Sequence, residues 1–246
     1  MEFDLSTIIQ AKFVKRYKRF FSDFEREDGS ILTAHCPNTG SMMGLLQVGA
    51  TCILTKSDNP KRKLAYTWQL INIGFDTPNW ISVNTHLDND LVHEALKDQR
   101  IEPLRDYASI NREVKVNAAT RADFYLTGCS TQPPCFLEVK HVHLKIGNQA
   151  AFPDSVTTRG QKHVQELMDI KKQGLRAVVI YVINRQDVTS FRPAHEYDPV
   201  YAQLFKQSIK EGVEHYAYAC TLNDHSLTIS HSIPIDHSFE NKNCIV

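Results

Sequence analysis

Short runs with the apolar pattern of β-strands alternate with turn signals through the first third of the chain. These runs occupy residues 11–25, 27–36, 49–57, 66–75 and 79–85. The second run contains Asp28-Gly29, a dipeptide typical of hairpin turns. Nothing in this region has the pattern of a long amphipathic helix. Several short strands at this spacing predict a small, partly open barrel of about five strands.

The pattern changes after about residue 84, where helical and strand-like segments begin to alternate. The expected helices occupy residues 89–98, 157–172 and 200–211, and the expected strands occupy 111–117, 122–126, 135–144, 176–184 and 213–222. The run 176–184 is continuously apolar, which is typical of a strand buried on both faces. We therefore expect a two-domain α+β protein, with a β-barrel at 1–84 and a mixed-sheet α/β domain at 85–246.

The composition is typical of a soluble globular protein, and the patterns at the N-terminus and along the chain bear on its location in the cell. The chain has 246 residues, of which 42% are hydrophobic, and no apolar run reaches the ~20 residues of a membrane helix. Because the first ten residues lack the layout of a signal peptide, we expect a cytoplasmic protein with no membrane partner. Its six cysteines are scattered without a Cys-x-x-Cys pair, which favours reduced thiols over disulfides or a zinc site.

The formal net charge is zero, so an anionic partner has to be held by local clusters of basic residues. One cluster lies within residues 12–20 and the other within 59–68, and both interleave basic with aromatic side chains. The residues that we assign to nucleic-acid binding here are Lys15, Arg16, Lys18, Arg19, Lys61, Arg62 and Lys63. Each cluster alone also fits a solvated strand edge. Two clusters in one small region favour a phosphate-binding surface with aromatic stacking platforms.

The segment 121–144 holds two apolar runs that carry acidic residues where a buried strand should not tolerate them. If the runs pair as an antiparallel hairpin, Leu126 faces Cys135. Counting outward in that register places Asp123 opposite Glu138, with their Cβ atoms ~5 Å apart. Two carboxylates at that distance repel each other unless a cation lies between them. The pattern therefore predicts a hard divalent ion, Mg²⁺ or Mn²⁺, with both carboxylates as ligands.

Strand alternation also places Lys140 on the same face as Glu138. A lysine beside such an ion can hold a water molecule or meet the charge that develops on a phosphate, so the set Asp123, Glu138 and Lys140 suits phosphodiester hydrolysis. The alternative is a salt-bridged pair on a solvated strand face. The matching register of Asp123 favours the site over that alternative.

Longer motifs then resemble a known family. The stretches HCPNTGSM, SDNPKRKLAYTW, LVHEAL, RADF, EVKHV and FPDSVTTRGQKHVQEL together resemble the sugar fermentation stimulation protein A family of bacteria and archaea, over nearly the whole chain. The resemblance implies an OB-fold domain followed by a PD-(D/E)XK nuclease-like domain, and DNA binding with little sequence preference. It matches Asp123, Glu138 and Lys140 to the acids and lysine of that motif. It also implies Glu94, on the preceding helix, as a further acidic metal ligand.

The helix expected at 157–172 places Arg159, Lys162, His163 and Glu166 on one face, near its beginning. Basic residues at a helix N-terminus favour an anionic ligand, so Arg159 and Lys162 join the predicted DNA-binding residues. A solvated face balanced by Glu166 is the alternative, and it is the better interpretation of Lys162 alone.

Other polar residues have local interpretations. His141 and His143 share the strand face opposite Lys140 and are expected to be core or edge histidines rather than zinc ligands. Asp154 fits a turn. The loop 35–46 is expected to pack between the two domains or to make backbone contacts with a phosphate.

Three functions remain open from the sequence. The first is a DNA-binding protein without sequence specificity that carries a nuclease-like divalent-metal site, with a regulatory role in sugar (maltose) metabolism implied by the resemblance. The second is an active metal-dependent nuclease acting on DNA or RNA. A sugar- or nucleotide-handling enzyme ranks last, because the chain lacks a Gly-rich phosphate loop.

Overall fold

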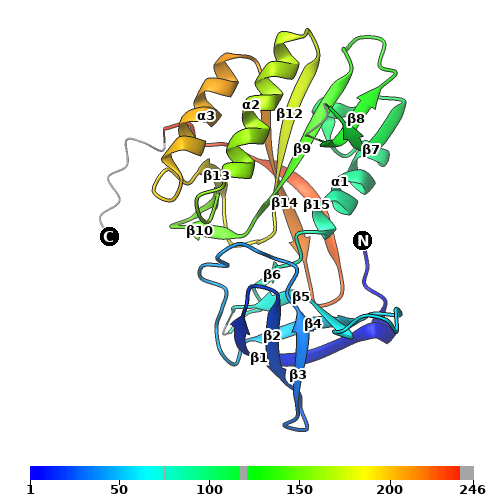
Figure 1. The fold of residues 1–246 in the computed structure, drawn as a ribbon, viewed down its shortest axis with the longest axis vertical. Helices are drawn as coiled ribbons and strands as arrows, with labels where there is room; N and C mark the ends of the chain where they lie inside the picture. Colours follow the sequence, from blue (N-terminus) through cyan, green and yellow to red (C-terminus); the bar gives the residue numbers. More distant parts are fainter. Residues whose placement is uncertain (75, 117–120, 239–246) are drawn as a thin grey trace.

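The computed structural model describes residues 1–74, 76–116 and 121–238. Two parts are stacked along the long axis of the molecule, with the β-rich N-terminal part below and the mixed α/β part above (Figure 1). The division between the two parts agrees with the change of sequence pattern near residue 84.

The N-terminal part is one six-stranded sheet that closes on itself. A 3₁₀ turn at Leu5–Thr7 leads into strands β1 (Ile8–Tyr17), β2 (Phe21–Glu25), β3 (Ile31–His35), β4 (Thr51–Lys56), β5 (Tyr66–Asn72) and β6 (Trp80–Ser82). The strands are ordered β3-β2-β1-β4-β5-β6, and a parallel pairing of His35 with Thr67 joins β3 to β5. The first five strands therefore form a closed barrel, which confirms the predicted strand number and corrects the expectation that the barrel is partly open.

Aromatic side chains fill the barrel. The rings of Phe13 and Trp68 stack with centroids 5.2 Å apart, and Phe24 meets Trp68 edge to face at the same distance. All three side chains are buried. Along β1, the buried Ala11 and Phe13 alternate with the exposed Lys12 and Lys15, which explains why the first run has the pattern of both a core strand and a charged surface.

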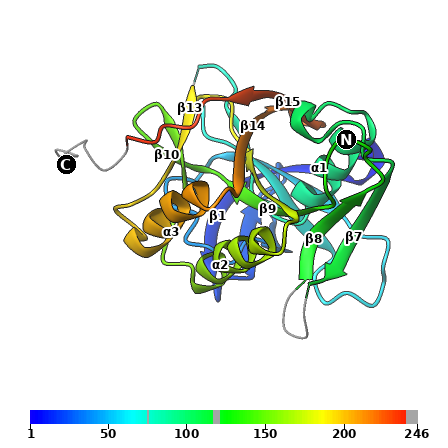
Figure 2. The same ribbon diagram turned by 90° about the horizontal axis from the view of Figure 1, so that it is seen from above.

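The second part is a three-layer α/β/α unit around a mixed sheet. Its six strands are β7 (Ser109–Lys115), β8 (Arg121–Thr127), β9 (Cys135–Val142), β12 (Arg176–Ile183), β14 (Glu214–Leu222) and β15 (Leu227–Ile233), ordered β15-β14-β12-β9-β8-β7. The helices are α1 (Leu87–Lys97), α2 (Thr158–Lys172) and α3 (Pro199–Lys210), with a 3₁₀ turn at Glu102–Leu104. Helices α2 and α3 cover one face of the sheet and α1 lies on the other (Figure 2).

The central strand β12 explains these layers. All eight of its residues are buried, as its apolar run predicts, and it is parallel to both β9 and β14. Val178, Ile180 and Val182 pack in the core beneath α1, whereas the alternate residues pack beneath α2 and α3. The predicted starts of α2 and α3 are also confirmed, because the side chains of Thr157 and Asp198 cap these helices. Helix α1 instead begins at Leu87, two residues before its predicted start, and its N-cap His86 makes no side-chain capping bond.

A small third sheet was not predicted. It contains β10 (Leu144–Ile146), β11 (Gln149–Phe152) and β13 (Ser190–Pro193), in the order β10-β11-β13. Strands of three or four residues are too short to show a periodic pattern in the sequence. This sheet lies near the junction with the barrel (Figure 1).

The two parts share a core and a polar seam. Ile53 and Leu70 of the barrel belong to the same buried cluster as Leu91 and Val92 of α1. In the seam, the carboxylate of Asp154 accepts hydrogen bonds from Ser41 Oγ (2.9 Å) and Met42 N (3.0 Å). The loop 35–46 therefore packs between the two parts, and Asp154 holds it there.

The five cysteines among the described residues are free thiols, as predicted, and Cys244 lies outside the described residues. Within the described part of the chain, each helix is too short or too polar to cross a bilayer.

Candidate functional site

The hairpin that carries the predicted acids has the expected register. Leu126 pairs with Cys135 and Phe124 with Leu137 in the antiparallel ladder of β8 and β9. Just past these pairs, the amide nitrogen of Val139 donates a 2.7 Å hydrogen bond to Asp123 Oδ2. The carboxylate of Asp123 therefore reaches across to β9, beside Glu138.

Glu138 and Lys140 form a buried ion pair. Lys140 Nζ lies 2.7 Å from Glu138 Oε1, and the two side chains are 9% and 8% exposed, Lys140 first. A third group comes from α2, where His163 Nδ1 contacts Glu138 Oε1 and lies 3.2 Å from Lys140 Nζ. His163 in turn accepts a 3.4 Å hydrogen bond at Nε2 from Arg159 Nε. The sequence placed His163 on the correct helix face, but nothing in the pattern predicted that it would contact Glu138.

The two carboxyl groups differ in their proton affinity. Burial raises the pKa of Asp123 to about 6, and the charge of Glu138 adds to this effect, although the Val139 N–H and Asn89 oppose it. Burial also acts to raise the pKa of Glu138, but the charge of Lys140 and the contact with His163 outweigh it, so the net shift of that pKa is downward. Carboxyl pairs whose pKa values are pushed apart are characteristic of catalytic sites.

These groups open onto a cavity of about 180 Å³. Its lining is mostly polar and comes from the second part, beginning with Thr85 just after the barrel. The lining residues are Thr85, Asp88, Asn89, Asp123, Glu138, Val139, Lys140, His141 and Arg159. The predicted catalytic set therefore faces one small space, whose wall also includes the predicted anion-binding Arg159.

The donor set fits a hard divalent ion. Mg²⁺ commonly takes one or two carboxylates and completes its shell with water and substrate phosphate. Asp123 and Glu138 supply two such carboxylates at the cavity wall. The described residues contain no cluster of three or more His, Cys, Asp or Glu groups placed to hold a metal, which fits poorly with a zinc site built from protein ligands.

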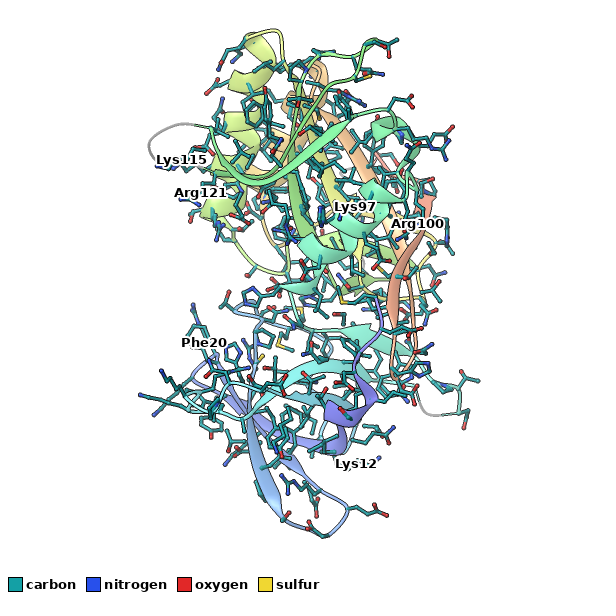
Figure 3. All side chains as sticks on the ribbon, turned by 90° about the vertical axis from the view of Figure 1, so that its right-hand side faces the viewer. Lys12, Phe20, Lys97, Arg100, Lys115 and Arg121 are labelled. Carbon is teal, nitrogen blue, oxygen red and sulfur yellow. The ribbon has the colours of Figure 1, made fainter. Side chains whose placement is uncertain are left out.

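The structure does not bring Glu94 into this set. Its carboxylate pairs with Arg100 Nη2 at 2.9 Å and with the N-terminal amine of Met1 at 3.1 Å. Arg100 lies on the opposite edge of the molecule from Arg121, which begins the strand that carries Asp123 (Figure 3). Helix α1 contributes Asn89 instead, whose Nδ2 donates a 3.0 Å hydrogen bond to Asp123 Oδ1.

Arg16, predicted to bind nucleic acid, has its guanidinium engaged within the protein. It donates to the carbonyl oxygens of Arg19 (3.1 Å), Gly40 (3.0 Å) and Asn38 (2.7 Å). These contacts tie the β1–β2 turn to the loop that packs against the second part. The geometry therefore gives Arg16 a structural role.

The other predicted basic residues mostly remain on the surface. Lys18 and Arg19 form the exposed tip of the β1–β2 hairpin, where both have positive φ angles of 48° and 61°. Lys61 and Lys63 are exposed as well. Three of the predicted residues have acidic or histidine neighbours: Lys15 lies 3.5 Å from Asp23, Lys162 lies 3.6 Å from Glu166, and Arg159 contacts His163.

The two basic clusters meet around His35. Its ring stacks on the half-exposed Phe20 with centroids 6.5 Å apart. Burial lowers the pKa of His35, and the nearby charges of Arg62 and His86 lower it further. Phe20 also lies along the same edge of the molecule as Lys115 and Arg121 of the second part (Figure 3). This edge therefore combines an aromatic platform with cations from both parts.

Two family models match this chain. The family model described as "SfsA N-terminal OB domain" matches residues 14–83, and the family model described as "Sugar fermentation stimulation protein RE domain" matches residues 86–226. The chain belongs to the sugar fermentation stimulation protein family. The barrel is the OB domain of that family, and the α/β unit is its RE domain.

Relatives in this family match most of the chain. The sugar fermentation stimulation protein homolog of Synechococcus elongatus is 46% identical over 209 residues, which cover 85% of this chain and 87% of the relative. That of Geobacter sulfurreducens is 41% identical over 223 residues, covering 90% and 93%. A solved structure, "The structure of Pyrococcus Furiosus SfsA in complex with Ca2+", has a TM-score of 0.84 at 24% identity and covers 96% of this chain and 99% of its own. The similarity confirms the fold.

Proposed function

We propose that this protein binds DNA with little sequence preference through its OB domain, and that its second domain hydrolyses phosphodiester bonds with Mg²⁺ or Mn²⁺. The observation that carries the proposal is the convergence of Asp123, the buried Glu138–Lys140 pair and Arg159 on one cavity. Buried charges are costly, and clusters of them with shifted pKa values are typical of functional sites. Support for a divalent ion also comes from the Pyrococcus furiosus relative, whose structure is described as a complex with Ca²⁺.

Asp123 and Glu138 are the residues that would hold the ion. When bound, the ion polarises a phosphoryl oxygen and lowers the pKa of a water molecule. Lys140, next to Glu138, supplies a positive charge close to the negative charge that grows on the phosphate. Arg159 binds a phosphate oxygen from the α2 side of the cavity, and His163 orients the Glu138 carboxylate between Lys140 and α2. Asn89 and the Val139 N–H keep the Asp123 carboxylate directed at the cavity.

DNA binding rests on the surface cations and Phe20. The exposed Lys18, Arg19, Lys61 and Lys63 supply phosphate contacts, and Phe20, stacked on His35, offers a face for a base. Such contacts are largely independent of sequence.

A second candidate is a DNA-binding regulator of sugar metabolism with an idle site. The observation in its favour is that Glu138 already has Lys140 and His163 as partners, while the described residues offer no set of three metal-binding side chains. In this case DNA binding survives the Asp123→Ala substitution, and no cleavage occurs with any divalent ion.

End-labelled single- and double-stranded DNA and single-stranded RNA, incubated with Mg²⁺ or Mn²⁺, test the proposal. Cleavage by the wild type should be lost in Asp123→Ala and in Lys140→Ala. The matched control is Asp169→Ala, which removes an exposed carboxylate of α2 that pairs with Lys172. Products that persist in both site variants would identify a contaminating nuclease, and the absence of products from the wild type would favour the regulator.

A further inference from the structure

A second cavity adjoins the first at the seam between the two domains. Its volume is about 180 Å³, and it shares Thr85, Val139, Lys140 and His141 with the cavity that holds Asp123. The rest of its wall comes from the OB-domain loop and from the segment that runs from β9 past β11. These residues are Asn38, Gly40, His143, Leu144, Ala151, Phe152 and Asp154. A group held in the first cavity would therefore have its covalent neighbour within reach of the second.

Buried polar atoms without partners line this second cavity. Asn38 and His143 are only 3% and 5% exposed. Within the part of the chain that the structure describes, Asn38 Nδ2, His143 Nδ1 and His141 Nε2 have no hydrogen-bond partner. Asn38 Oδ1, in contrast, is occupied, because it accepts from Gly40 N at 2.8 Å. Buried polar atoms are almost always paired, so a row of unpaired ones at a cavity wall points to a ligand that pairs with them.

The wall chemistry indicates a neutral, planar ligand rather than a second phosphate. Asp154 adds a carboxylate, which the loop residues Ser41 and Met42 already engage and which would repel an anion. Burial lowers the pKa of His143, which keeps its ring neutral despite the opposing effect of the nearby Asp154 carboxylate. The remaining wall is apolar and includes Phe152. The cavity is also smaller than the ~300–1,000 Å³ of sites for drug-sized molecules.

We propose that this cavity receives one nucleobase, that of the nucleotide next to the phosphate held by the Asp123, Glu138 and Lys140 set. The proposal rests on the proposed function, because it needs a nucleic acid in the first cavity. Asn38 Nδ2, His141 Nε2 and His143 Nδ1 pair with the edge of the base, because His141 Nδ1 already contacts Asp88 and His143 Nε2 lies 3.4 Å from Asp154 Oδ2. Phe152 and Leu144 contact the faces of the base. Because a paired and stacked base cannot enter a seam between domains, the substrate is a single strand or a frayed end.

The first test changes the nucleic acid and leaves the protein intact. Single-stranded DNA oligonucleotides carry one abasic residue at successive positions, and the cleavage products with Mn²⁺ are mapped for each. We expect cleavage to fall about tenfold at one fixed offset from the abasic residue, since removing one base from its protein partners has about this effect. Cleavage elsewhere on the same strand should be unchanged. A map in which every phosphate is cut equally would overturn the base pocket while leaving the proposed nuclease in place.

The second test removes one unpaired donor. Asn38→Ser keeps a side-chain oxygen that can accept from Gly40 N and deletes Nδ2. Asn72→Ser is the matched control, because Asn72 Oδ1 accepts from Gly74 N in the same Asn-x-Gly arrangement but outside the cavity. We expect Asn38→Ser to slow cleavage of intact strands several-fold. On abasic strands, it should have no additional effect on cleavage of the phosphate at the fixed offset from the abasic residue, because the base that Asn38 would contact is missing.

The outcomes separate the two proposals. Equal effects of Asn38→Ser on intact and abasic positions would overturn the base pocket, as would equal effects of the two serine variants. If wild-type protein cuts no substrate with any divalent ion, the proposed nuclease fails and the base pocket fails with it. Thermal unfolding of each variant identifies loss of folding, and the abasic map of the wild type decides the question even if Asn38→Ser does not fold.

Discussion

The Val139 amide donates its hydrogen to Asp123 Oδ2 at 2.7 Å, beyond the last pairs between β8 and β9. A backbone donor of the next strand, together with Asn89 Nδ2 on the other carboxylate oxygen, thus fixes the orientation of this acidic side chain. The bond offsets part of the cost of burying Asp123 next to Glu138, and the remaining cost appears as the raised pKa of Asp123.

Asp123→Asn should stabilise the metal-free protein above pH 6. Because the pKa of Asp123 in the folded protein is about 6, above its ordinary value of 3.8, the folded state binds the proton more tightly than the unfolded state does. The free energy of unfolding therefore falls as pH rises from about 4 to about 6, by at most ~3 kcal/mol. Asparagine keeps an acceptor for Val139 N and carries no charge. Urea unfolding with a chelator at pH 5 and pH 7.5 should show a much larger gain at pH 7.5.

A gain of equal size at both pH values would contradict an ionisation effect at Asp123. The control is Asp90→Asn, because the partly exposed carboxylate of Asp90 pairs with Arg112 at the surface; this variant should show little change at either pH.

Lys140→Met should abolish cleavage and also destabilise the fold. Removing the lysine leaves the buried Glu138 without its cation, and breaking such a buried pair typically costs ~3–5 kcal/mol. The contact with His163 lessens the loss. The double variant Lys140→Met/Glu138→Gln should regain most of the stability without regaining cleavage, because position 138 then carries no buried charge that lacks its cation. Urea unfolding measures the change in stability, and labelled DNA measures cleavage. A double variant as unstable as Lys140→Met would show that Lys140 stabilises the fold by packing rather than by its charge.

Substitutions of Arg16 and of the hairpin-tip residues Lys18 and Arg19 should have opposite effects: the first should reduce stability, and the others should reduce DNA binding. Arg16→Ala removes three hydrogen bonds to backbone carbonyls and should lower the free energy of unfolding by roughly 2 kcal/mol. It should leave the salt dependence of DNA affinity unchanged. Lys18→Ala and Arg19→Ala should instead leave stability within ~0.5 kcal/mol.

The hairpin-tip variants should reduce the slope of log affinity against log salt concentration by ~0.7–0.9 for each phosphate that the variant no longer neutralises. Fluorescence anisotropy with a labelled oligonucleotide at several salt concentrations measures this slope. An unchanged slope in both Lys18→Ala and Arg19→Ala would remove the barrel tip from the DNA-binding surface.

His215 should make the protein sensitive to acid. Burial lowers the pKa of this residue to about 3, so the folded state holds it neutral while the unfolded state takes up a proton below pH 6.5. Stability should therefore fall as pH drops from 6.5 towards 3, by up to ~1.4 kcal/mol per pH unit. Its ring lies 2.8 Å from Ser208 Oγ and packs against Phe205. His215→Gln should be less stable at pH 7.5 but lose less on acidification, as urea unfolding over that range would show; parallel pH curves would exclude His215 as the cause.

Local patterns in the sequence predicted much of the fold because they depend on neighbours in the chain. The continuous apolar run of β12 and the capping residues Thr157 and Asp198 are local signals, and each element appears where it was expected. The register of β8 and β9 was also predictable, because alternation and turn length constrain it together. The predicted register by itself was enough to place Asp123 beside Glu138 on neighbouring strands.

Contacts between distant elements were harder to predict. Glu94 and Asn89 are five residues apart on α1, which is about 140° around the helix axis. Only the packing of Leu91, Val92 and Ala95 against the sheet decides which of the two faces Asp123. The same applies to Arg16: the sequence predicted that the loop 35–46 could pack between the domains, but not that Arg16 would donate to its carbonyl groups.

The order of the main helices and of the strands of the two large sheets, the two-part architecture and the acid–acid–lysine set could all be inferred from the sequence; the small sheet of β10, β11 and β13 could not. The neighbours of that set could not: Asn89 comes from α1, His163 from α2, and Asn38 of the OB domain bounds a second cavity. Periodicity records which face of an element is buried. The partner of a polar side chain depends instead on the relative rotation and position of whole elements, which the packing of the shared core sets.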